Sequence, residues 1–147
     1  MAIKHLKRLL ALDIGMKRIG IAVSDPLNMF SIGLDTINRL PEIKAIETII
    51  KLCNSYNVEK LIVGLPYNMN GTTGEQANDV YKFVEALKEK TLLEIIFQDE
   101  RLTSKLAHKI LIEQNISPSR NKAIIDKKAA ELILQQYMDI IQNRKDK

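Results

Sequence analysis

The sequence has one cysteine, two histidines, no tryptophan, and aromatic residues that make up only 5% of the chain. The single thiol, Cys53, cannot form a disulfide within the chain, which favours a reducing compartment. His5 and His108 stand in no Cys/His spacing that would hold zinc and complete no serine–histidine–aspartate pattern. The scarcity of aromatic residues argues against a platform on which nucleic-acid bases stack.

Long apolar runs are also missing. No stretch reaches the roughly 18 apolar residues that cross a bilayer, and the N-terminus lacks the apolar core of a secretion signal. We therefore expect a cytoplasmic protein that makes no membrane contact. Hydrophobic residues still form 46% of the 147 residues, which predicts a single folded domain over 1–147. A net charge of +4 permits nucleic-acid binding without requiring it.

The order of apolar patterns predicts an α/β fold. Runs at 8–14 and 18–24 indicate two strands of an antiparallel hairpin, and the small residues Gly20, Ala22 and Ser24 would let a helix pack closely on the second strand. Further strands are predicted at 31–37, 60–65 and 93–98, and helices at about 41–53, 75–90, 103–115 and 124–143. This alternation predicts a mixed five-stranded sheet with helices on both faces.

Acidic residues lie at the ends of three predicted elements. Asp13 closes the first strand, Asp99 and Glu100 follow the fifth, and Asp126 lies at the start of the last helix. Neighbouring strand ends converge at one edge of such a sheet, where ligands bind. Carboxylates held together repel one another unless a cation neutralises them, and Mg²⁺ and Mn²⁺ prefer oxygen ligands. A pair of such ions activates water in phosphodiester hydrolysis.

Each of these features also has a simpler interpretation. Asp13 could be a turn residue, Asp99 could merely end a strand, and Asp126 could be a helix-start acid that interacts with the macrodipole. The segment GLPYNMNGTTGEQA (64–77) could present backbone amides to a phosphate, or simply connect a strand to a helix. Basic residues beside the acids fit either a polyanion site or an ordinary charged surface.

Four segments resemble the YqgF family, also called RuvX, relatives of the RuvC Holliday-junction resolvases. They are LALDIGMKRIGIAVSD (10–25), IVGLPYNMNGTTGEQA (62–77), DERLTSKLAHKIL (99–111) and DKKAAELILQQYM (126–138). They occur in the family's order and span nearly the whole chain. The resemblance implies an RNase H-like fold. It also implies a phosphodiester hydrolase dependent on Mg²⁺ or Mn²⁺, an endo- or exonuclease that matures the 5′ end of pre-16S rRNA during ribosome biogenesis.

The resemblance further implies the residues of the site. It makes Asp13, Glu100 and Asp126 the catalytic, metal-binding acids. The residues it places at the substrate are Lys17, Arg18, Gly71, Gly74 and Arg101. The density of positive charge at Arg120, Lys122, Lys127 and Lys128 predicts further contacts with a nucleic-acid backbone.

The sequence departs from the family pattern at two points. Met16 stands where the family usually has threonine, so a hydroxyl contact is lost there. RuvC itself carries a glutamate after its fourth strand, whereas this chain has Gly64-Leu65-Pro66. The remaining acid must therefore come from Glu100.

Other functions stay open at this point. The substrate could instead be structured DNA, as for a Holliday junction resolvase-type endonuclease. The chain could also be a non-catalytic nucleic-acid-binding protein of ribosome assembly or transcription. The Asp-x-Gly hairpin resembles a phosphate motif of actin-like ATPases and sugar kinases too. In those proteins two such domains close around ATP, so this chain would need a dimer to build the cleft. Both a monomer and a homodimer are compatible with the sequence.

Overall fold

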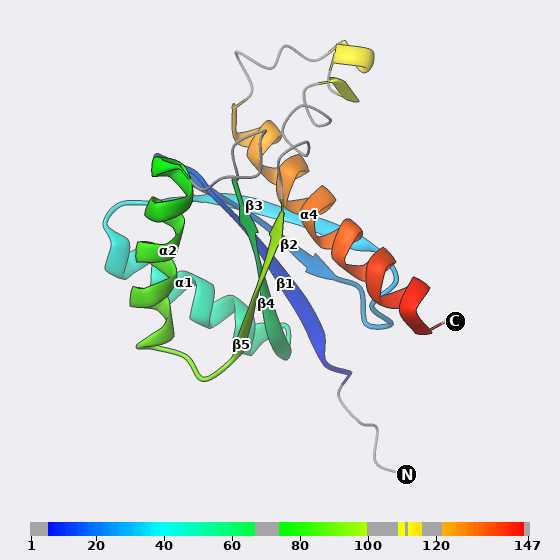
Figure 1. The fold of residues 1–147 in the computed structure, drawn as a ribbon, viewed down its shortest axis with the longest axis horizontal. Helices are drawn as coiled ribbons and strands as arrows, with labels where there is room; N and C mark the ends of the chain where they lie inside the picture. The colour runs from blue at the N-terminus through cyan, green and yellow to red at the C-terminus, as the bar shows by residue number, and fades with distance from the viewer. Residues whose placement is uncertain (1–5, 67–73, 100–108, 111, 116–121, 146–147) are drawn as a thin grey trace.

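The computed structural model describes residues 6–66, 74–99, 109–110, 112–115 and 122–145 (Figure 1). The strands and the three complete helices lie within two residues of their predicted positions. Of the helix predicted at 103–115, residues 109–110 and 112–113 are helical, and most of the remainder lies outside the described residues. The elements are β1 (Arg8–Ile14), β2 (Arg18–Ser24), β3 (Ser31–Asn38), α1 (Glu42–Ser55), β4 (Val58–Leu65), α2 (Glu75–Lys88), β5 (Glu94–Asp99) and α4 (Lys122–Lys145).

The five strands form one mixed sheet in the order β3-β2-β1-β4-β5. β2 is antiparallel to both β1 and β3, whereas β4 is parallel to both β1 and β5. The carboxyl ends of β1, β4 and β5 therefore meet at the same edge of the sheet. This confirms the predicted mixed sheet and the convergence of its strand ends.

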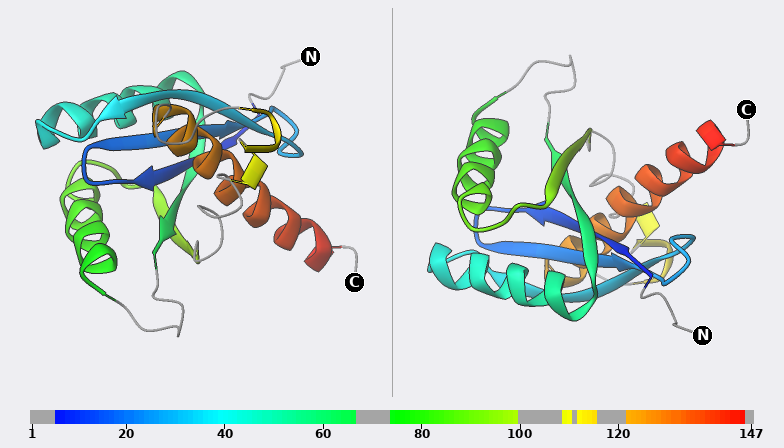
Figure 2. Two further views of the ribbon diagram at one scale, coloured as in Figure 1. Left: turned by 90° about the horizontal axis from the view of Figure 1, so that it is seen from above. Right: turned by 90° about the horizontal axis from the view of Figure 1, so that it is seen from below.

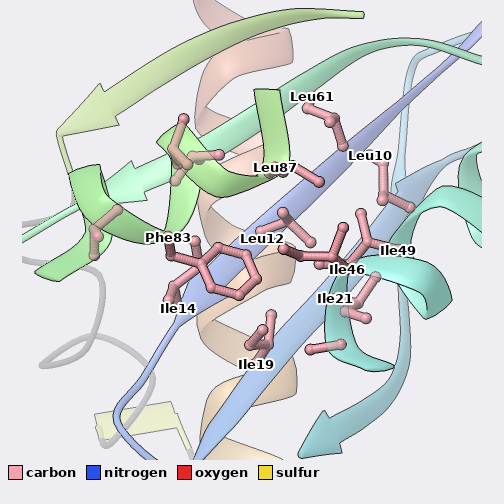
Figure 3. Packing of buried hydrophobic residues seen from close by; sticks show 14 of the residues in the cluster. Leu10, Leu12, Ile14, Ile19, Ile21, Ile46, Ile49, Leu61, Phe83 and Leu87 are labelled. Carbon is pink, nitrogen blue, oxygen red and sulfur yellow. The ribbon is translucent and has the colours of Figure 1, made fainter. Parts of the chain in front are cut away.

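Helices cover both faces of the sheet, with α1 and α2 on one side and α4 on the other (Figures 1 and 2). Side chains alternate between the two faces along a strand. On β1, Leu10 and Leu12 point into the cluster shared with α1 and α2, in which Phe83 is fully buried (Figure 3). Leu9 and Ala11 point into a smaller cluster beneath α4.

The small residues of the sheet determine how closely α4 approaches. A Cβ atom added at Gly20 of β2 would lie 2.0 Å from the backbone oxygen of Asp126. The predicted close packing of a helix on the small face of β2 is thus confirmed. On β3, a Cβ at Gly33 would meet the side chains of Lys127 and Glu131. The first turns of α4 therefore lie directly on the sheet.

Cys53 lies on the buried face of α1, and burial raises the pKa of its thiol to about 11. A thiol in this environment is protonated at neutral pH and acts as a small apolar side chain. Within the described part of the chain, no helix combines the length and apolar character needed to span a membrane.

Candidate metal and nucleic-acid site

Asp13 lies inside β1 and is not part of the turn that follows. It is the penultimate residue of the strand, is partly buried, and pairs with Gly20 on β2. The interpretation of Asp13 as a turn residue is therefore wrong. Residues directly opposite one another in an antiparallel pair point to the same face of the sheet. Because Gly20 faces α4, the carboxylate of Asp13 does too.

Asp126, on the C-terminal helix α4, lies over the same face of the sheet. Helix α4 begins at Lys122, two residues earlier than predicted, so Asp126 lies in its second turn. The interpretation of Asp126 as a helix-start acid is therefore wrong, because the macrodipole acts within the first turn. The backbone of Asp126 rests on Gly20, the cross-strand neighbour of Asp13. Asp126 therefore lies over the face of the sheet to which Asp13 points, above the strand next to that of Asp13.

Arg18, the first residue of β2, pairs with Asp126. Its Nε donates a hydrogen bond of 3.0 Å to Oδ2 of Asp126, and the two side chains are 28% and 23% exposed. Burial raises the pKa of the Asp126 carboxyl, while the bond and the charge of Arg18 act in the opposite direction. The ionised form of Asp126 is therefore held in place by a neighbouring cation.

Residues of the neighbouring strands β4 and β5 lie beside Asp13 on the same face of the sheet. Leu12 pairs with Val63, so the next residues in the same parallel register are Asp13 and Gly64. Gly64 in turn pairs with Gln98 of β5. Gln98 shares the face of Ile96, which packs beneath α4. Gln98 was not among the residues predicted from the sequence, although the alternation of β5 places it two residues after Ile96 on that face.

A second residue that the sequence analysis missed is Arg39, which holds the turn between β1 and β2. Its buried guanidinium donates to the backbone oxygen of Gly15 at 3.0 Å and forms a two-bond ion pair with Asp79 of α2. Its backbone N–H also donates to the oxygen of Lys17 at 3.0 Å. The residues after Asp13 are thereby tied to α2. No local sequence signal marks this role.

The structure places the other predicted residues as follows. Lys17 is exposed in the β1–β2 turn. The stem of Lys127 packs over Gly33, and Lys128 forms an ion pair of 3.1 Å with Glu131. Gly74 immediately precedes α2, whose buried side chains pack on the opposite face of the sheet from α4. Outside the described residues lie Glu100, Gly71, Arg101 and Arg120, together with the side chain of Lys122.

The carboxylates of Asp13 and Asp126 supply part of a site for a divalent cation. Asp13 and Asp126 supply hard oxygen ligands on one face of the sheet, and the missing side chain of Gly20 lets the backbone of Asp126 approach β2 closely. Among the described residues, no group of three acidic, cysteine or histidine side chains gathers as a metal site. Any third carboxylate from Glu100 lies outside them.

A mixed five-stranded sheet in this strand order, with helices on both faces and α4 across β1 and β2 (Figure 1), defines the RNase H-like class of folds. The crystal structure of Fowlpox virus resolvase with Holliday junction DNA has a TM-score of 0.56 at 12% identity, covering 91% of this chain and 98% of that one. For Thermus thermophilus RuvC with a Holliday junction substrate the TM-score is 0.54 at 13% identity, covering 90% and 96%. These likenesses confirm the predicted fold.

The chain belongs to the RuvX family. The family model, described as "RuvX: Holliday junction resolvase", matches residues 7–140. The chain is 46% identical over 134 residues to the "Putative pre-16S rRNA nuclease" of Clostridium novyi, covering 91% of this chain and 99% of that protein. It is also 46% identical over 137 residues to the protein of the same description from Clostridium tetani, covering 93% and 99%. The predicted family is confirmed.

Proposed function

We propose that this chain is a divalent-cation-dependent nuclease that processes the precursor of 16S rRNA. The observation that carries the proposal is the placement of Asp13 and Asp126 on one face of the sheet, with the backbone of Asp126 over Gly20, the cross-strand neighbour of Asp13. The substrate is supported by relatives of that description that are 46% identical over about nine-tenths of the chain. The cytoplasm, where ribosomes assemble, is the compartment this function requires.

The catalytic proposal assigns roles to the acids and to the residues around them. Asp13 and Asp126, with Glu100 as the third acid, would hold Mg²⁺ or Mn²⁺. When bound, such an ion activates water and stabilises the leaving oxygen of a phosphodiester. The Arg39 guanidinium fixes the turn after Asp13, so that the carboxylate keeps one orientation when substrate arrives.

Basic residues around the acids would bind the substrate backbone. Lys17 has the strongest support, because it is exposed in the turn four residues after Asp13. Arg18 lies beside Asp126 and reaches the same face. We retain as further candidates for this role Gly71, Gly74, Arg101, Arg120, Lys122, Lys127 and Lys128.

The direct test is cleavage of a 16S rRNA precursor that carries its 5′ extension. The full chain is incubated with this RNA and Mn²⁺, and the new 5′ ends are mapped by primer extension. We expect cleavage by the wild type, and a loss of about a hundredfold or more in Asp13→Asn, because the neutral amide no longer offsets the charge of a cation. Asp35→Asn is the matched control, since Asp35 is an exposed acid on β3 of the same sheet.

A second candidate is cleavage of branched DNA, favoured by the family description and by the resolvases that share the fold. A four-way DNA junction is therefore assayed beside the RNA under the same conditions. Cleavage of the junction alone would replace the rRNA proposal with the resolvase function. Binding of the RNA without cleavage of either polymer, with Mn²⁺ and with Mg²⁺, would indicate a non-catalytic binding protein.

A further inference from the structure

Arg18 lies where a cation is needed, beside the carboxylate of Asp126. The two residues are 108 positions apart in sequence, yet Nε and Oδ2 are 3.0 Å apart. A carboxylate that is largely removed from water requires a nearby positive charge to stay ionised. In this structure the guanidinium provides that charge.

The guanidinium of Arg18 donates fewer hydrogen bonds than the guanidinium of Arg39. Arg39 is buried, and its guanidinium donates two bonds to Asp79 and one to the oxygen of Gly15. Arg18 is 28% exposed, and among the described residues its side chain donates one hydrogen bond, to Asp126. Its remaining N–H groups can therefore bind an anion from solution, and phosphate oxygens match that geometry.

We propose that Arg18 is the resident counter-ion of Asp126, and that a divalent cation and a phosphate group of the substrate displace it together. The carboxylate of Asp126 would then bind the cation, and the guanidinium of Arg18 would bind the phosphate. Binding of either partner then raises the affinity for the other, because the ion pair has to open only once. This inference rests on the proposed function for its substrate, but its first test needs no substrate.

The first test measures Mn²⁺ binding to the full chain by calorimetry at pH 8, without nucleic acid. Arg18→Gln removes the competing charge, so Mn²⁺ affinity is expected to rise roughly three- to fivefold, as the loss of a partly exposed ion pair suggests. Lys51→Gln is the control for a general charge effect. Lys51 is exposed on α1, which packs on the opposite face of the sheet from α4, and it makes no ion pair with a described residue. Its affinity for Mn²⁺ should change by much less.

An Mn²⁺ affinity of Arg18→Gln equal to that of the wild type would overturn the inference. An equal rise in both variants would show a general charge effect and would overturn it too. Weaker Mn²⁺ binding in Arg18→Gln would also overturn it, since Arg18 would then support the cation, and the nuclease proposal would remain. If neither the wild type nor Arg18→Gln binds Mn²⁺, the inference and the metal-dependent function both fail. Arg18→Lys keeps the charge, so its Mn²⁺ affinity should lie between those of the wild type and Arg18→Gln. Thermal melting checks that each variant is folded.

The second test measures the coupling itself. Binding of a fluorescein-labelled RNA hairpin is followed by anisotropy, with and without Ca²⁺ as the oxygen-liganded cation. The wild type and Lys51→Gln should gain RNA affinity when Ca²⁺ is added, and Arg18→Gln should lose most of that gain. A gain of the same size in all three proteins would overturn the coupling.

Discussion

Arg39 and Asp79 form an ion pair with two hydrogen bonds, and the two side chains differ greatly in their exposure to solvent. The Arg39 side chain is 10% exposed and that of Asp79 is 43% exposed, and Nη2 lies 2.9 Å from Oδ1. The guanidinium also lies 5.3 Å from the centre of the Phe83 ring. The cost of breaking this pair therefore depends on which partner is left behind.

Asp79→Ala is expected to destabilise the protein more than Arg39→Met. The first change leaves a buried guanidinium with the Gly15 oxygen as its remaining described acceptor, at a cost of about 2–3 kcal/mol. The second leaves a carboxylate that water reaches and keeps the apolar stem, at a cost of about 1 kcal/mol. Urea unfolding at pH 7 measures both free energies. The reverse order would show that Arg39 acts mainly through its other contacts.

The same pair predicts an acid-dependent loss of stability. The hydrogen bond from Arg39 lowers the pKa of the Asp79 carboxyl below its usual 3.8. A group whose pKa is lowered by folding stabilises the fold while ionised. Its contribution is complete above about pH 4 and is lost as the pH falls through the lowered value. As the pH falls below about 4, the free energy of unfolding should therefore fall more steeply in the wild type than in Asp79→Asn. Parallel curves would contradict this assignment.

Gly20→Ala should damage both the packing of α4 and the candidate site. A Cβ there meets the backbone of Asp126, which cannot rotate away, so we expect a loss of about 1–3 kcal/mol. Gly33→Ala is the control, since its new Cβ meets the side chains of Lys127 and Glu131, which can move, and should cost less than about 1 kcal/mol. Denaturant unfolding compares the two. Equal costs would mean that α4 shifts easily on the sheet.

Asp126→Asn should remove metal-induced stabilisation without weakening the fold. Burial raises the pKa of Asp126, so the folded state favours the neutral carboxyl, and the ionised form costs stability at neutral pH. In metal-free buffer at pH 7, Asp126→Asn should melt at or above the wild-type temperature, while the rise caused by Mn²⁺ disappears. Asp139→Asn, an exposed acid on the same helix, should keep that rise. A lower melting temperature in Asp126→Asn would show that its charge mainly supports the fold.

Ser24 and Ser31 should differ sharply when changed to alanine. The Ser24 hydroxyl is buried, accepts the N–H of Leu9 at 2.8 Å and donates to Asn28, so Ser24→Ala should cost about 1–2 kcal/mol. The Ser31 hydroxyl is also buried but has no partner among the described residues, so Ser31→Ala should be neutral or slightly stabilising. Thermal melting of both variants measures this difference. Equal losses would show that Ser31 has a partner in solution.

The sequence predicted those parts of the fold that depend on local periodicity. Alternating apolar residues located the strands, and the small residues of β2 predicted close packing of a helix, as found at Gly20. An error of two residues at the start of α4 was enough to place Asp126 in the wrong turn. Helix starts are set by weak local preferences, so such errors are common.

The parts of the site that the sequence did not predict depend on distant contacts. Arg39 has its role because Asp79, 40 positions later, lies beside it in the fold. The pairing of Arg18 with Asp126 likewise joins the two ends of the chain. In the local sequence, an arginine that forms such an ion pair is indistinguishable from an arginine exposed to solvent. Only the folded structure shows which of the two it is.

The docking of α4 on β1 and β2 has a consequence for protein synthesis. A ribosome completes all five strands before it adds α4, so the nascent sheet exposes Leu9, Ala11, Ala22 and Ile62, which α4 later covers. Asp13 lacks its neighbour Asp126 until that final segment emerges from the exit tunnel. A nascent chain held on the ribosome before that point would carry half of the acidic pair and an uncovered apolar face. It would be a target for chaperones until α4 covers that face.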